Sequence, residues 1–192
     1  MTSLLRPALS LFVALSLLTG LVYPWTITAV SQGLFPHQAH GSLLYDQGQV
    51  IGSELIGQSF AEPRHFWSRP SATSPTPYNG ANSGGSNLGP SNPAWHDAVT
   101  ARVAALRAAD PGNTTPVPVD LVTASASGLD PHISPAAALY QVSRVARLRH
   151  LPAAEVKALV DSHTERPWLG LLGEARVNVL ALNAALDQRS AR

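Results

Sequence analysis

The sequence predicts a helix-rich α/β domain with a small sheet, held on the extracytoplasmic side of a membrane by one N-terminal transmembrane helix. An uncharged apolar run from Pro7 to Trp25 opens the chain, and helix-like and strand-like apolar spacings alternate after it. The chain is 45% hydrophobic and only 13% charged, which favours a compact domain over a disordered tail. We therefore expect an anchor over residues 1–30 and a soluble domain over residues 31–192.

The apolar run is long enough to cross a bilayer as a helix. At about 1.5 Å per residue, its roughly 19 residues span ~28 Å, close to the ~30 Å of a hydrocarbon core. Pro7 suits the first helical turn, whereas Pro24 predicts the end of the helix or a kink there. Arg6 carries positive charge at one end, and Tyr23 and Trp25 suit an aromatic belt at the other. This asymmetry predicts a cytoplasmic N-terminus.

A cleaved signal peptide is the alternative interpretation of the run. Signal cores usually span about 7–15 residues and end at a small-x-small site. The best candidate site, after Ala29, has Ile27 where a small residue is needed, so a retained anchor is favoured. Within the run, Ser16 and Gly20 form a small-x-x-x-small pair that would let another helix approach closely, although ordinary helix composition explains the pair equally well.

Short elements around a long polar loop follow the predicted membrane helix. The pattern predicts a strand, one or two helical turns and an apolar segment packed on the core over residues 43–51, 53–58 and 60–67, respectively. Residues 71–92 are uncharged and rich in Ser, Asn, Gly and Pro, which is typical of a loop. Because Tyr78 and Leu88 are unusual in a pure spacer, an ordered docking loop is favoured there over a flexible connector.

The C-terminal half predicts several helices and one strand. Helix starts are marked by proline pairs, namely Asn92-Pro93, Ser134-Pro135 and Leu151-Pro152. Apolar residues at helical spacing follow these starts: Val99, Val103 and Leu106; Leu139, Val142, Val145 and Leu148; Val156, Leu159 and Val160. A last amphipathic helix is expected over residues 176–187, and alternation over residues 117–123 predicts a strand.

The sequence lacks the residues of several functional classes. Cysteine is absent, which excludes thiol nucleophiles, disulfides and cysteine metal sites. The only lysine, Lys157, lies in an expected helix without a glycine-rich turn before it, so there is no Walker A loop. No i,i+4 histidine pair and no Gly-x-Ser-x-Gly elbow occurs, and a net charge of +1 without a basic patch argues against nucleic acid. We expect no catalytic residue, no metal site and no stably bound cofactor.

Several blocks along the whole chain carry a resemblance to one family. They include Arg69-Pro70-Ser71, Tyr78-Asn79, SGGSNLGPSN at 83–92, VTASASGLDPHIS at 122–134 and LGLLGEARVNVL at 169–180. Together with the membrane segment, these blocks resemble the C subunit of the Kdp high-affinity potassium-transporting ATPase of bacteria. Small departures are Ala126, where the family often has glycine, and Ala175, where it often has proline.

The resemblance implies a non-catalytic accessory subunit of an ATP-driven potassium import complex in the bacterial inner membrane. The implied partners are a pumping P-type ATPase subunit, a channel-like potassium-binding subunit and a small membrane subunit. The resemblance further implies a catalytic chaperone that raises the ATP affinity of the pumping subunit. Since the predicted orientation keeps the body away from cytoplasmic ATP, we expect an indirect effect, through coupling of about 1–3 kcal/mol or roughly 5- to 150-fold in affinity.

The expected partner contacts are the small pair of the helix and polar residues of the resembling blocks: Ser16, Gly20, Arg69, Ser71, Tyr78, Asn79, Ser83, Gly84, Gly85, Ser86, Asn87, Asp130 and His132. The alternative is a nucleotide-binding module that forms a ternary complex with ATP and the pump, with Gln141, Arg144 and Arg147 as its contacts. An anchored extracytoplasmic hydrolase is a weaker alternative, because it would need a base and a nucleophile in contact.

Overall fold

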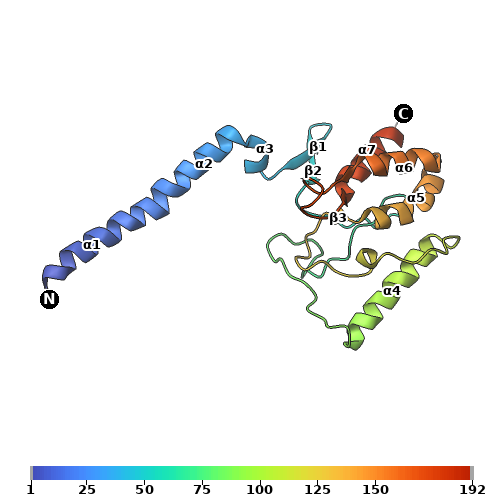
Figure 1. The fold of residues 1–192 in the computed structure, drawn as a ribbon, viewed down its shortest axis with the longest axis horizontal. Helices are drawn as coiled ribbons and strands as arrows, with labels where there is room; N and C mark the ends of the chain where they lie inside the picture. The colour runs from blue at the N-terminus through green and yellow to red at the C-terminus, as the bar shows by residue number, and fades with distance from the viewer. Residues whose placement is uncertain (1, 191–192) are drawn as a thin grey trace. The chain divides into compact units, whose positions relative to one another are not determined.

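The computed structural model describes residues 2–190, which divide into two compact units between Ile51 and Gly52 (Figure 1). The first unit consists of a long N-terminal helix, a short helix and a β-hairpin. The second unit holds the remaining helices and a three-stranded sheet, and it contains the loops of the candidate site.

The N-terminal helix is continuous from Thr2 to Leu34. It comprises α1 (Thr2–Leu17), a π-helical turn η1 (Leu18–Val22) and α2 (Tyr23–Leu34). From Ser3 to Leu34 it is long and apolar enough to cross a membrane by length and composition, and an 18-residue window within it has a mean hydropathy of 1.8. None of that apolar stretch is buried inside the described chain.

The prediction that the helix ends near Pro24 is wrong. In a regular α-helix, proline removes one hydrogen bond and its ring meets the carbonyl four residues earlier, which is Gly20 here. The π turn lies directly before this position, and the Tyr23 N–H bonds to Leu18 O. Because a π turn is wider than an α turn, it gives the proline ring room, and the helix continues.

The rest of the first unit is α3 (Pro36–Ala39) and the hairpin of β1 (Leu43–Asp46) and β2 (Gln49–Ser53). The single strand predicted over residues 43–51 is split by a tight turn, because Gln47 and Gly48 have φ of 48° and 80°. Positive φ at both central residues is what a type I′ hairpin turn requires.

A small antiparallel sheet lies at the centre of the second unit. β5 (Arg176–Asn178) runs between β3 (His132–Ile133) and β4 (Thr164–Glu165). Ile133 and Thr164 both pair with Val177, which is fully buried. The sheet therefore connects segments that are far apart in the sequence.

Three helices build the core around this sheet. They are α5 (Pro135–Arg149), α6 (Ala153–Ser162) and α7 (Val179–Ser190). α5 packs against α6, α6 packs against α7, and both α5 and α7 contact β5. The predicted inward residues of α6, which are Val156, Leu159 and Val160, are all buried.

The proline-marked helix starts are confirmed. Asn92 Oδ1 accepts a hydrogen bond from Ala94 N at 2.9 Å where α4 (Pro93–Ala109) begins. Ser134 Oγ accepts one from Ala137 N at 3.0 Å where α5 begins. These side chains satisfy amides that have no partner within the helix, which is why the helices begin there.

Four predicted details of the second unit are wrong. Residues 53–58 form no helix, because the chain turns back and Ser53 pairs with Ile56 as a β-bridge. Residues 117–123 contain the 3-10 helix η2 (Val119–Leu121) rather than a strand. The last helix starts only at Val179, because residues 176–178 pair as β5. On α5, Leu139 and Leu148 are about two-fifths exposed, and polar residues share the buried face instead.

A strap, residues 60–69, lies across α5 and α7 and confirms the predicted core segment, since Phe66 is fully buried. Asn183 accepts from Phe66 N at 2.9 Å and donates to Phe66 O at 3.0 Å. Gln141 accepts from Trp67 N at 2.8 Å and donates to Trp67 O at 3.2 Å. Two amide side chains thus satisfy the strap's buried peptide groups, as a neighbouring strand would.

Candidate functional site

The polar loop, residues 71–92, is fixed to a second loop, residues 123–131. Ser71 Oγ donates to Gly128 O at 2.7 Å. Ser83 Oγ and Gly84 N both donate to Ser127 O, at 3.0 and 2.9 Å. The polar loop is therefore ordered by its own chain and is not a flexible connector.

Hydrogen bonds inside the polar loop use several of the predicted contact residues. Ser71 Oγ accepts from Tyr78 N at 2.9 Å, and the Tyr78 hydroxyl donates to Arg69 O. Burial raises the pKa of the Tyr78 hydroxyl. Asn79 N donates to Thr73 Oγ1 at 3.0 Å, and Asn79 Nδ2 donates to Ser74 O at 3.1 Å. Ser71, Tyr78 and Asn79 thus hold the loop in shape.

Glycine allows the closest approaches between the two loops. A Cβ at Gly85 would lie 2.9 Å from Ala126 O, and one at Gly128, where φ is +67°, would lie 2.7 Å from Gly84 O. At Gly84 itself a Cβ would meet nothing within 4 Å. Ser83, Ser86 and Asn87 are exposed, so they form the accessible part of the predicted loop motif.

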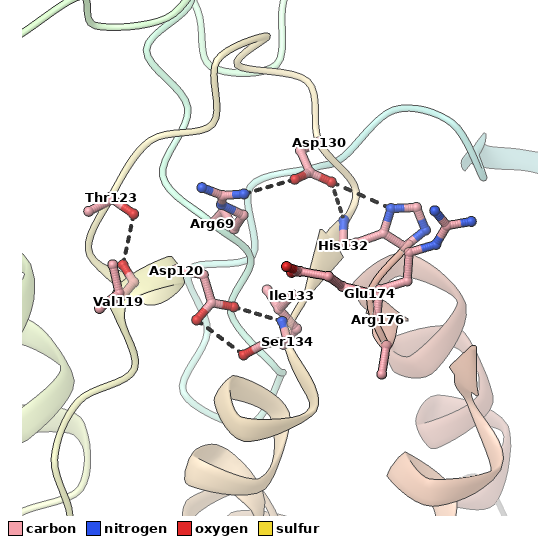
Figure 2. Close-up of a pocket in the computed structure, with 11 residues that line it drawn as sticks. Arg69, Val119, Asp120, Thr123, Asp130, His132, Ile133, Ser134, Glu174 and Arg176 are labelled. Atoms are coloured by element: carbon pink, nitrogen blue, oxygen red, sulfur yellow. Dashed lines mark hydrogen bonds and ion pairs between the residues drawn. The ribbon is translucent and has the colours of Figure 1, made fainter. Parts of the chain in front are cut away.

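A groove of about 460 Å³ lies beside the second loop, with charged side chains on its walls (Figure 2). Its polar and charged lining residues are Arg69, Asp120, Thr123, Asp130, His132, Ser134, Glu174 and Arg176. They come from the strap, the segment around η2, β3 and the segment that enters β5. The fold thus brings together three of the predicted contact residues, Arg69, Asp130 and His132.

Asp130 is the centre of the charged cluster. Its Oδ2 lies 3.0 Å from Arg69 Nη1, and its Oδ1 accepts from His132 N at 3.0 Å and lies 3.4 Å from His132 Nδ1. Burial alone would raise the pKa of the Asp130 carboxyl, but the hydrogen bonds of His132 and the Arg69 charge together lower it. All three side chains are between a fifth and a third exposed, so a partner can reach them.

Five further polar or charged groove residues were not among the predicted contacts, namely Asp120, Thr123, Ser134, Glu174 and Arg176. Asp120 accepts from Ser134 N at 2.7 Å and from Ser134 Oγ at 3.2 Å. Figure 2 shows Glu174 and Arg176 beside these groups, and Arg176 pairs with Glu165 at 2.9 Å. Their sequence signal was membership of the blocks that resemble the family, which include Thr123, Ser134, Glu174 and Arg176. Asp120 lies outside these blocks, so no sequence signal pointed to it.

The groove can recognise a polar partner but offers no evident metal site. Carboxylates, guanidinium groups and an imidazole alternate along its wall, so it presents both acceptors and donors. Among residues 2–190, no three or more His, Asp or Glu side chains are grouped so that they could hold a metal ion. Such a wall suits hydrogen bonding to the polar segment of a protein partner.

The predicted nucleotide contacts lie apart from this groove. Gln141 and Arg144 are only 1% and 2% exposed. Arg144 donates to Pro63 O, to His65 O and to Gln141, and its guanidinium lies 4.7 Å from the centre of the Trp67 ring. Burial lowers the pKa of Arg144 to about 10.

Arg147 is the accessible member of the predicted nucleotide set. Its side chain is 53% exposed, and Nη1 pairs with the buried Asp110 at 2.8 Å. Nucleotide contact by this set stays a prediction. So does helix contact by Ser16 and Gly20, which lie in the first unit; a Cβ at Gly20 would meet nothing within 4 Å.

Comparisons with known proteins agree over nearly the full length. Residues 5–188 match the family described as KdpC, the K+-transporting ATPase c chain. The potassium-transporting ATPase KdpC subunit of Polaromonas naphthalenivorans is 66% identical over 187 residues, or 97% of this chain and 95% of that protein. The KdpC subunit of Variovorax paradoxus is 65% identical over 191 residues, or 100% of this chain and 99% of that protein.

Proposed function

This chain belongs to the KdpC family, the c chain of K+-transporting ATPases, and from that premise we propose that it acts in assembly and coupling of a potassium import complex. Chemistry and ion selection would then reside in other subunits. The partners are a pumping P-type ATPase subunit, a channel-like potassium-binding subunit and a small membrane subunit.

The observation that carries this proposal is the charged groove beside two interlocked loops. Arg69, Asp130 and His132 are positioned by hydrogen bonds before any partner arrives, so little ordering entropy is lost on binding. The same residues stay partly exposed on an open surface. A prepared polar surface of this kind supports docking of a partner's loop.

The long apolar helix supports a membrane-anchored placement. Arg6 lies near the start of α1, and the aromatic side chains of Tyr23 and Trp25 follow further along the helix. The positive-inside tendency then favours a cytoplasmic N-terminus and an extracytoplasmic body at the bacterial inner membrane. The mass of the mature chain tests the anchor, because a mature N-terminus near Val30 would mean a cleaved signal peptide.

The proposed effect on ATP is indirect. The subunit stabilises one conformation of the pump, and coupling of about 1–3 kcal/mol raises ATP affinity roughly 5- to 150-fold. Burial of Gln141 and Arg144 supports this route, since ATP could reach them only if the strap opened. Equilibrium ATP binding to the full-length chain alone is the test: saturable binding would favour the direct module instead.

Removing the groove's ion pair tests the docking surface. We expect Arg69→Met to reduce copurification of the chain with the other subunits and to reduce potassium uptake. Arg64→Met is the matched control, because the Arg64 side chain is 59% exposed and pairs only with Glu62, which is 67% exposed, among the ion pairs found in residues 2–190. Normal assembly and uptake with Arg69→Met, in a chain that keeps its melting temperature, would contradict the assigned surface.

A further inference from the structure

The second unit carries one loop whose large apolar side chains face solvent. In the tip loop, residues 167–173, Trp168, Leu169, Leu171 and Leu172 are 68%, 74%, 84% and 62% exposed. Four large exposed apolar residues thus lie within five consecutive positions, whereas single exposed apolar residues are common on soluble domains. The groove described above does not include any of these four residues.

The tip loop has a defined shape. Trp168 and Leu172 form an antiparallel bridge, with Trp168 N to Leu172 O and Leu172 N to Trp168 O both at 3.0 Å. Leu169 and Gly170 have φ of 52° and 73°, which turns the chain between the two bridged residues. The backbone is therefore paired with itself, and the apolar side chains project from a closed turn.

We propose that the tip loop inserts into the headgroup boundary of the bilayer that holds the chain's own N-terminal helix. Leucine side chains with one tryptophan suit this depth, where the indole body lies against acyl chains and its N–H meets polar groups. The exposed Arg166 precedes the loop and can meet lipid phosphates. The proposal rests on the anchored placement given above.

The tether keeps the tip loop near lipid, and the composition of the loop favours lipid over a protein partner as the occupant. The helix ends at Leu34 and the second unit begins at Gly52, so at ~3.5 Å per residue the connection cannot exceed roughly 60 Å. A body held this near a membrane meets lipid at high effective concentration. From Trp168 to Leu172 the only polar side-chain atom is the indole nitrogen, whereas protein interfaces carry about one hydrogen bond per 100–200 Å².

The absence of cysteine makes site-specific labelling direct. Three full-length variants, Leu171→Cys, Leu11→Cys and Ala101→Cys, each receive one environment-sensitive fluorophore and are placed alone in nanodiscs of phosphatidylcholine and phosphatidylglycerol. Leu11 reports on the helix, and Ala101 is an exposed control on α4. Quenching by lipids with a spin label near the headgroup is compared with quenching by aqueous iodide.

With spin-labelled lipid, we expect loss of emission at residues 11 and 171 but not at residue 101. With iodide, we expect loss of emission at residue 101 but not at residues 11 and 171. Quenching by lipid at residue 11 together with iodide quenching at residue 171 would overturn the tip-loop proposal while leaving the anchor intact. Iodide quenching at residue 11 would instead overturn the anchor. If residue 171 became protected only after the other subunits were added, the occupant would be a protein and the lipid proposal would be wrong.

Discussion

Replacing Gly85 by alanine should separate the polar loop from the second loop. The added Cβ would lie 2.9 Å from Ala126 O and 3.3 Å from Ala126 Cα. Both atoms belong to the backbone, so no side-chain rotation can relieve the contact. Gly84→Ala is the matched control, because its Cβ would meet nothing within 4 Å.

The size of the effect follows from comparing the two variants, Gly85→Ala and Gly84→Ala. Each alanine restricts the unfolded chain equally and so favours folding by about 0.4–1 kcal/mol. Only Gly85→Ala adds the steric cost of overpacking, about 1–3 kcal/mol. The difference between the variants isolates that cost, which corresponds to roughly 5- to 150-fold in the equilibrium for loop opening.

Hydrogen exchange of the full-length chain measures this equilibrium. Peptides from residues 71–92 should exchange faster in Gly85→Ala than in the parent, because bonds such as Gly84 N to Ser127 O open more often. Gly84→Ala should exchange as slowly as the parent or more slowly. Equal exchange in the two variants would refute the reasoning that glycine at 85 is required by the approach of Ala126.

Three further predictions concern the strap, the groove and α4. Asn183→Ala should lower the free energy of unfolding by about 1–3 kcal/mol for each of the two Phe66 peptide groups that it leaves unpaired, measured by urea denaturation. Because the folded pKa of Asp130 is lowered, its carboxylate stabilises the fold above the unfolded pKa and this contribution is lost as pH falls through the folded value, below about pH 4. Asp130→Asn should therefore flatten the acid side of the melting-temperature profile. Asn92→Ala should cost about 0.5–2 kcal/mol at the start of α4, seen as faster amide exchange near Ala94.

Each of these predictions has a contradicting outcome. Unchanged urea unfolding in Asn183→Ala would mean that water satisfies the strap. Parallel acid loss of melting temperature in the parent and in Asp130→Asn would assign the acid sensitivity to other carboxylates. Asn92→Asp keeps the capping oxygen, so it should restore slow exchange, and failure to do so would remove the capping explanation.

The elements predicted correctly are those whose sequence signal lies within one or two helical turns. Asn92-Pro93 and Ser134-Pro135 predict helix starts because a capping side chain and a preset φ act within one turn. The buried stripe of α6 also follows from spacing alone. The strand predicted over residues 117–123 was wrong because, within residues 2–190, these residues pair with no strand and the chain forms η2 instead.

The site depended on long-range contacts that spacing does not encode. The sequence blocks indicated Arg69, Asp130 and His132 one by one. These residues come together only because the fold brings the strap against the second loop, and Arg69 and Asp130 are 61 positions apart in the sequence. The inward position of Arg144 is a second example. The sequence made it a candidate nucleotide contact, yet strap carbonyls and the Trp67 ring provide partners that only the folded chain supplies.

The π turn at η1 has a consequence for any helical-wheel description of the membrane segment. A π turn acts as one extra residue within an α-helix, and one residue corresponds to about 100° of rotation. Faces assigned upstream of Leu18 therefore cannot be extended past Val22 with a single periodicity. A substitution scan of this segment should find that the lipid-facing and helix-facing positions follow one helical periodicity before the turn and a second, rotated periodicity after it. Deletion of one residue from the turn should restore a single periodicity, but it would also bring the Pro24 ring back against the carbonyl four residues earlier.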